Sequence, residues 1–252
     1  MSAAGEFEEA EARARALAVA PRVWGGDPLI VSWLARSSAA TAAIRHGRGA
    51  EVLPELETLI TEVERTAAGS PDLRAMLLVL RSNRIAVLIQ QDRCAEAEAE
   101  AKDILRAITR LAHLTDVRAT ELDAVAKLAD ALNGQGRYEE AEASARGNLP
   151  RADELTADDL RHILVRSLNG QGRYEEALTE VRRLAPVARA DSGKVDLAKA
   201  QALHGLGNRA EAEATARRAL IACEQLLHPA HPRTQEARTL LALITVEDSA
   251  PE

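Results

Sequence analysis

The chain of 252 residues is poor in the side chains from which sheets, disulfide frameworks and membrane spans are built. Aromatic residues make up only 2% of it, and strands favour aromatic and β-branched residues, so a β-sheet protein is disfavoured. Two cysteines in a chain of this length do not make a disulfide framework. No stretch reaches the roughly 18 consecutive apolar residues that a membrane-spanning helix needs.

The balance of charge is acidic, with a formal net charge of −7 at pH 7 and a sequence pI of about 5.5. A nucleic-acid surface normally needs a basic face, and an anionic membrane attracts basic segments, so we expect neither partner. The first residues, up to Ala20, are rich in glutamate and lack the long apolar core of a secretory signal. We therefore expect a cytoplasmic protein.

Alanine is the side chain that the sequence has in abundance. Hydrophobic residues make up 46% of the chain, and alanine is prominent among them. Because alanine is a strong helix former with little bulk, the composition predicts an all-α protein whose helices pack closely through small side chains.

A short motif recurs at a nearly constant spacing, which is the signature of a repeat protein. Residues 136–141 read Gly-Arg-Tyr-Glu-Glu-Ala, and so do residues 172–177, a separation of 172 − 136 = 36 residues. A third copy begins at Gly207, a further 207 − 172 = 35 residues on. Weaker copies occupy residues 92–97, 47–52 and 5–10. Such an array can fill this length without a single globular core.

Each position of the motif has a physical reason. The glycine ends one helix, because it adopts the left-handed conformation at little cost. The aromatic residue caps the core at the turn, and the two glutamates favour the positive end of the next helix dipole. The alanine marks a place where two helices approach too closely for a larger side chain. The motif therefore predicts a turn between two packed helices.

The residues around the motif resemble the tetratricopeptide repeat, whose first helix carries a large residue, Leu, a small residue and another large residue. In one unit these positions and the two small positions of the second helix hold Val125, Leu128, Ala129, Leu132, Ala141 and Ala145. The resemblance implies an all-α, right-handed α-solenoid of antiparallel helix pairs that holds another molecule. Residues 231–242 resemble a repeat of the kinesin-light-chain subtype, which implies a stand-alone bacterial protein.

The register divides the chain into three parts. We expect a half repeat and its connector at 1–27, about five helix pairs and a final helix at 28–246, and a disordered tail at 247–252. Helices are predicted near 5–19, 28–45, 50–67, 71–90, 94–113, 117–133, 137–147, 157–169, 173–185, 193–204, 208–227 and 232–246. Looser connections are expected at 20–27, 147–156 and 186–192. Thr156 with Asp159 resembles a capping box at the start of one helix.

Metal binding and catalysis are both disfavoured. Cys223, His228 and His231 suggest a cluster, but Cys223 falls on the buried stripe of its helix and a closed zinc site needs four ligands. Cys94 occupies the slot of the turn aromatic, where a small core residue is expected more than a nucleophile. The paired glutamates recur with the repeat, which catalytic acids would not do. We therefore predict no metal, no cofactor and no enzyme.

The concave face of the array is the remaining candidate for a site. The positions of the first helices that packing does not use are expected to point there. They are Asn83, Asp130, Asn133, His162, Arg166, Asn169, Gln201 and His204, with Thr41, Val87 and Ala126 on the same surface. Asn133 and Asn169 are equivalent residues of successive units, and their amides suit a peptide backbone in either polarity. The alternative is a solvated face with no ligand.

Three functions remain open. The first is a non-catalytic scaffold that binds a protein or peptide in the concave face. The second is a sensor that responds to a peptide or small ligand and acts in trans on a partner protein. The third is a structural, self-assembling piece, since the helices at 5–19 and 232–246 predict weak self-association.

The two tryptophans have different expected roles. Trp33 is expected in the core, because it lies in the first turns of a predicted helix. Trp24 stands in the preceding connector, where packing and contact with a partner are equally plausible.

Overall fold

The computed structural model describes residues 9, 11–16, 27–114, 116–184 and 193–246. Every regular element among these residues is helical. The chain divides into two compact units, residues 1–127 and 128–252. The described residues thus confirm the all-α class that the alanine content and the repeats predict.

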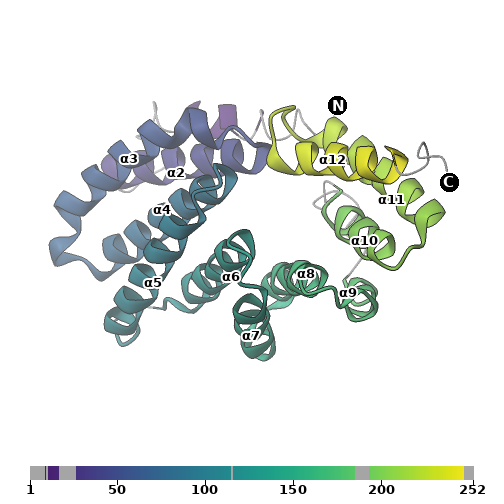
Figure 1. The fold of residues 1–252 in the computed structure, drawn as a ribbon. Helices are drawn as coiled ribbons and strands as arrows, with labels where there is room; N and C mark the ends of the chain where they lie inside the picture. The colour runs from purple at the N-terminus through teal and green to yellow at the C-terminus, as the bar shows by residue number, and fades with distance from the viewer. Residues whose placement is uncertain (1–8, 10, 17–26, 115, 185–192, 247–252) are drawn as a thin grey trace. The chain divides into compact units, whose positions relative to one another are not determined.

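The first unit is built from helix pairs that follow one another along the chain (Figure 1). Its helices are α2 (Pro28–His46), α3 (Gly49–Thr66), α4 (Pro71–Gln90), α5 (Cys94–Leu111) and the first part of α6 (Arg118–Gly134), with a short 3-10 turn, η2 (Ala67–Gly69). α2 packs on α3, α3 on α4, and α4 on α5. Of the predicted helix at 5–19, residues 9 and 11–16 are helical, and the rest lies outside the described residues.

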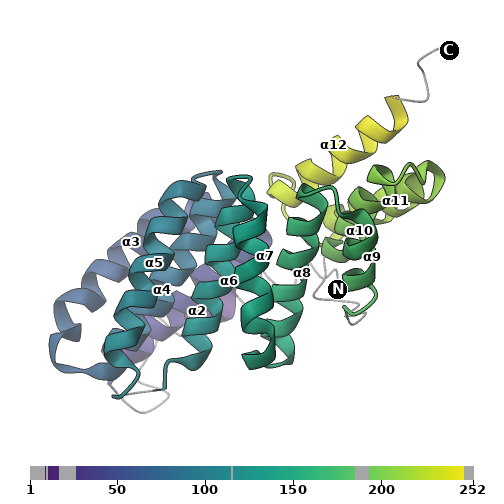
Figure 2. The same cartoon turned by 60° about the horizontal axis from the view of Figure 1, so that its bottom comes forward.

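The second unit continues the same pattern. It holds the end of α6, then α7 (Tyr138–Asn148), the 3-10 turn η3 (Leu149–Arg151), α8 (Glu154–Gly170), α9 (Tyr174–Val181), α10 (Lys194–Gly205), α11 (Arg209–Leu226) and α12 (Pro232–Val246). In Figure 2, α7, α8 and α9 lie side by side, and these neighbours pack on one another. The first helix of one pair also contacts the first helix of the next, as α8 does with α10.

The turns inside the pairs have the conformation that the motif predicts. Gly136, Gly172 and Gly207 have φ of 74°, 74° and 76°, in the left-handed region that favours glycine. The next residue closes the turn on the helix just ended, since the Arg173 N–H donates to the Leu168 carbonyl at 2.9 Å. Asp92 holds the same slot in a weaker copy of the motif and has φ of 60°.

The small residue of the motif lies at the closest approach of the paired helices. Ala97, Ala141, Ala177 and Ala212 are all 0% exposed, as predicted. Each unit has its own apolar cluster: one gathers Trp33, Leu56 and Leu80 with their neighbours, and the other gathers Leu203, Ala216 and Ile244 with theirs. Trp33 is therefore a core residue, whereas Trp24 lies outside the described residues.

The structure corrects the predicted boundaries around α8 and α9. α8 begins at Glu154, because Asp153 caps it by accepting the Thr156 N–H at 2.8 Å, so the capping box at Thr156 is wrong. The connection at 147–156 is a tight turn through η3, and the two other predicted connections fall largely outside the described residues. α9 ends at Val181, four residues before the predicted end at 185.

Candidate functional site

The second unit contains an open groove with a volume of about 280 Å³. First helices supply most of its wall, and the first residues of two second helices supply the rest. The lining residues are Asn133, Tyr138, Arg166, Asn169, Gly170, Tyr174, Gln201, His204, Glu236 and Leu240. Five of the eight predicted site residues are therefore brought together in this groove, and Asp130, His162 and Asn83 are not among the lining residues.

The two tyrosines of the groove are seated on glycines of the following repeat. A Cβ atom added to Gly170 would lie 2.4 Å from the Tyr138 ring, and one added to Gly205 would lie 2.2 Å from the Tyr174 ring. No side chain larger than hydrogen fits beneath either ring without a shift. Each tyrosine at the start of a second helix thus packs on the last residue of the next first helix.

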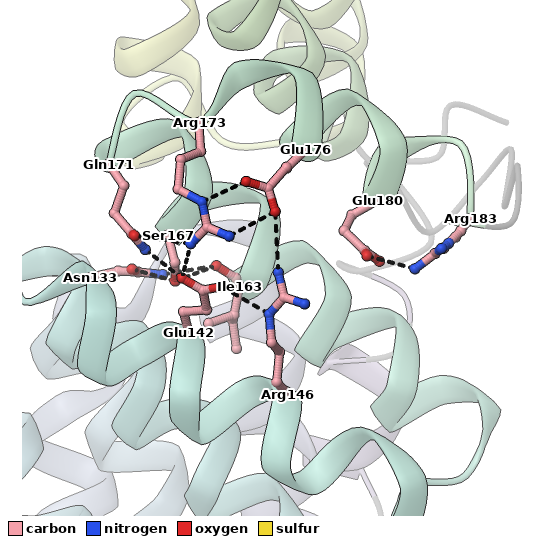
Figure 3. A network of polar contacts seen from close by, with 10 residues as sticks. All are labelled: Asn133, Glu142, Arg146, Ile163, Ser167, Gln171, Arg173, Glu176, Glu180 and Arg183. Atoms are coloured by element: carbon pink, nitrogen blue, oxygen red, sulfur yellow. Dashed lines mark hydrogen bonds and ion pairs between the residues drawn. The ribbon is translucent and has the colours of Figure 1, made fainter.

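The amide of Asn133 is used inside the array. Its Nδ2 donates to the Ile163 carbonyl at 3.1 Å, and its Oδ1 accepts from the Ser167 hydroxyl at 2.8 Å (Figure 3). Asn133 is only 5% exposed and Ser167 is 0% exposed. Because both ends of the amide are occupied and buried, Asn133 positions α8 on α6.

Asn169 makes half of the same contact one repeat later. Its Nδ2 donates to the Ala198 carbonyl at 2.9 Å, as Asn133 does to Ile163. Its Oδ1 is buried and has no hydrogen-bond partner among the described residues. The reason lies in the sequence: 35 residues after Ser167 stands Ala202, which has no hydroxyl to donate.

The charged residues of the groove are paired across first helices. Arg166 on α8 forms an ion pair with Asp130 on α6. Gln201 on α10 donates to the Glu236 carboxylate on α12 at 2.7 Å. These four residues stand at equivalent positions of successive units, 36, 35 and 35 residues apart. The groove wall therefore carries one positive and one negative lining side chain, each already bonded.

Three polar side chains of the groove have no such partner. Among the residues that the structure describes, the hydroxyls of Tyr138 and Tyr174 and the imidazole of His204 make no side-chain hydrogen bond. All three are only partly buried. The polar groups that remain free to meet a ligand are therefore these three.

His162 lies on α8 outside the groove lining and is partly buried. Desolvation by burial holds the pKa of its imidazole well below the ordinary value, and the positive charges of Lys194, Arg166 and Arg233 lower it further. A hydrogen bond with the Lys194 backbone opposes these effects in part. The imidazole of His162 is therefore neutral at pH 7.

The first unit holds the other residues predicted for the concave face. Asn83 donates from Nδ2 to the Thr41 hydroxyl at 2.9 Å, so these two side chains meet each other across α2 and α4. Val87 is 0% exposed and Ala126 is 8% exposed. The prediction that Val87 and Ala126 belong to an accessible surface is wrong, because both pack in the core.

The residues weighed as metal ligands, Cys223, His228 and His231, and the cysteine weighed as a nucleophile, Cys94, have the surroundings of structural residues. Cys223 is 0% exposed in the apolar cluster of the second unit, and Cys94 is 6% exposed at the start of α5. The Nδ1 atoms of His228 and His231 accept the backbone N–H groups of Ala230 and Arg233 at 3.3 and 3.0 Å. No three His, Cys, Asp or Glu side chains of the described ranges are arranged to hold a metal ion.

A second polar network stiffens the groove from the side of the turns (Figure 3). The Glu142 carboxylate on α7 accepts from Arg146 at 2.8 Å, from Gln171 at 2.7 Å and from Arg173 at 2.6 Å. Arg173 also donates twice to Glu176, at 2.7 Å each, and this hydrogen bonding lowers the pKa of the Glu176 carboxyl. The turn that carries Tyr174 is thus held against α7.

Sequence reasoning missed the tyrosines as groove residues. It assigned the turn aromatic to packing alone, although the ring also forms part of an open wall. A signal was present in the sequence, because Gly170 and Gly205 recur 35 residues apart at the ends of first helices. A repeated glycine inside a helical pattern marks a close approach, here by an aromatic ring from the preceding repeat.

These features define a class: a repeat protein of antiparallel helix pairs, each pair stacked on the next. The family of the tetratricopeptide repeat matches residues 123–147, 160–183 and 195–218. Residues 123–218 therefore contain three tetratricopeptide repeats, which supply eight of the ten residues that line the groove. No curated protein and no solved structure matches the chain. In the part that the structure describes, no helix is long and apolar enough to cross a membrane.

Proposed function

We propose that the chain is a non-catalytic scaffold that binds a peptide segment of another protein in the groove of the second unit. Tetratricopeptide repeats suggest a protein-interaction role, and the groove supplies a surface for it. The observation that carries the proposal is the division of the lining residues into two sets. The side chains of one set bond to neighbouring helices. The side chains of the other set make no hydrogen bond within the described residues and are available to a ligand.

The two sets have different proposed roles. Asn133, Arg166 and Asn169 hold the first helices in register, Arg166 through its ion pair with Asp130 outside the lining, so they shape the groove. Tyr138, Tyr174 and His204 present the groups that a bound segment meets. Gln201 belongs to the first set while it is bonded to Glu236. This division assigns direct contact to fewer residues than the sequence alone suggests.

The test is affinity selection of peptides from a random displayed library on the whole chain. We expect peptides that bind the native chain and bind His204→Ala about fivefold more weakly, the effect of losing one hydrogen bond of about 1 kcal/mol. The matched control is His228→Ala, because His228 lies in the connector before α12 and outside the groove lining. Circular dichroism melts verify that both variants fold.

Two results would overturn the proposal. One is a selection that yields no peptide above background. The other is a set of peptides whose binding is unchanged in His204→Ala, in Tyr138→Phe and in Tyr174→Phe, since such peptides bind elsewhere on the chain.

A further inference from the structure

We propose that the segment bound in this groove is an uncharged, proline-rich stretch in the polyproline II conformation. The inference rests on the proposed function and names the class of its ligand. Three features of the groove support it: the spacing of the two tyrosines, their open hydroxyls, and the internal pairing of the charges.

The packing of α8 on α10 sets the spacing of the two tyrosines near the length of one polyproline II turn. Tyr138 and Tyr174 are seated on Gly170 of α8 and Gly205 of α10, so their separation follows that of the two helices. α8 and α10 are in contact, and packed helices lie about 8–10 Å apart. A polyproline II helix rises about 3.1 Å per residue with three residues per turn, or about 9 Å per turn. One turn of the ligand therefore spans one repeat.

The open groups of the groove suit this backbone. A polyproline II segment has no internal hydrogen bonds, so its carbonyl groups are free to accept. The hydroxyls of Tyr138 and Tyr174 have no hydrogen-bond partner among the described residues and can donate, and their rings offer flat surfaces on which proline rings can pack. Grooves that recognise such segments elsewhere are lined by aromatic side chains in the same way.

The charges of the groove favour a neutral ligand. Among the described residues that line the groove, Arg166 and Glu236 are the charged ones, and each is bonded to a neighbouring first helix. A charged side chain in the ligand would have to replace one of these contacts. An uncharged stretch meets no such cost, and its order in the free state reduces the entropy lost on binding.

Other modes of peptide recognition fit less well. A partner helix needs a continuous apolar groove for its buried stripe, and Leu240 is the one aliphatic side chain among the described residues of the lining. An added strand needs an open sheet edge, and the described ranges contain helices only.

The experiment uses the tyrosine content of the chain. Tyr138 and Tyr174 are its only tyrosines, so labelling with 3-fluorotyrosine gives two fluorine signals that both report on the groove. The whole labelled chain is titrated with acetyl-(Pro-Pro-Ala)4-amide. The control peptides are acetyl-(Gly-Ser-Ala)4-amide, which is flexible, and an alanine-rich helical peptide of equal length.

We expect both fluorine signals to shift and saturate with the proline-rich peptide, at an affinity at least tenfold above that for either control. Tyr138→Phe and Tyr174→Phe, measured by calorimetry, should each weaken binding about fivefold, because each removes one donor and keeps its ring on the glycine.

The outcomes separate the two proposals. Equal response to the flexible or the helical peptide overturns the polyproline II inference and leaves a peptide-binding groove. No response to any of the three peptides also overturns the inference, and the library selection then decides the proposed function by itself. Unchanged affinity in both Tyr→Phe variants would remove the tyrosines from the binding surface.

Discussion

At the scale of single residues, neighbouring repeats act as natural controls for each other. Asn133 and Asn169 hold equivalent positions and make the same contact to the next first helix. Only the first of them has a hydroxyl donor for its Oδ1, because Ser167 is replaced by Ala202 one repeat later. The structure therefore shows the same amide with and without its second hydrogen bond.

This difference predicts opposite effects for two substitutions. Ser167→Ala leaves the buried Oδ1 of Asn133 without a partner and should lower the free energy of unfolding by about 1–3 kcal/mol. Ala202→Ser supplies the missing donor to Asn169 and should raise it by up to about 1 kcal/mol. Urea unfolding followed by circular dichroism measures both. A stabilising Ser167→Ala would contradict the assignment of this hydrogen bond.

His162 gives the stability of the chain a pH dependence of known sign. Its pKa in the folded state is lowered by burial and by three nearby cations, so the folded chain resists its protonation. The unfolded chain takes up the proton below about pH 6.5. The free energy of unfolding should therefore fall as the pH drops from about 7 toward the lowered pKa, and this contribution should stay level above about pH 7.

The measurement compares the native chain with His162→Gln from pH 5 to 8. We expect the native chain to lose free energy of unfolding relative to His162→Gln as the pH falls. His113→Gln is the control, because His113 is exposed in the turn that follows α5. A flat difference for His162→Gln across this range would show that the imidazole is not desolvated.

At the scale of elements, most of the fold could be predicted from the sequence. Helix positions followed from the recurring motif, the glycine turns and the Pro caps, and the starts of α4, α5 and α12 were predicted to the residue. The start of α8 was missed because Asp153 and Thr156 are both plausible caps, and only the backbone conformation selects between them. The local sequence alone therefore does not decide which of these two residues caps the helix.

The groove was harder to predict than the helices. The repeat register predicts that first helices line the concave face, and first helices supply most of the wall of this groove. The roles of the individual side chains were not, because they depend on contacts between residues some 30 to 36 positions apart. The packing of one repeat on the next decides whether an asparagine faces a ligand or a neighbouring carbonyl. The periodicity of the sequence does not predict these contacts.

The tyrosine–glycine contact is the element-scale feature that a mutant cycle can test. Gly205→Ala places a methyl group within 2.2 Å of the Tyr174 ring and should cost about 1–3 kcal/mol. Tyr174→Ala should cost roughly as much, less than a fully buried aromatic, because the ring is partly exposed. In the double variant the methyl group has no ring to displace. The loss of unfolding free energy in the double variant should therefore be smaller than the sum of the losses in the two single variants.

Thermal or urea unfolding of the four chains gives the coupling energy. Strict additivity would mean that the ring and the glycine do not touch. Gly147→Ala serves as the comparison, because a Cβ atom there meets nothing within 4 Å.

At the scale of the whole molecule, the aromatic residues divide between the two compact units. Both tryptophans lie within residues 1–127, and both tyrosines lie within residues 128–252. Tryptophan fluorescence therefore reports on the first unit, and fluorotyrosine signals report on the second. In a repeat array each unit is stabilised by its own packing and by its nearest neighbours, so the two probes need not follow one transition.

This distribution leads to a prediction about cooperativity. Leu56→Ala removes a side chain that is 0% exposed in the apolar cluster of the first unit and should cost about 2–5 kcal/mol there. The urea midpoint seen by tryptophan should fall more than the midpoint seen by fluorotyrosine. Leu160→Ala, at an equally buried position of the second unit, should reverse the order. Equal shifts of both midpoints in both variants would instead mean that the array unfolds as one cooperative body. In that case a ligand bound in the groove would stabilise residues 1–127 as strongly as the repeats it touches.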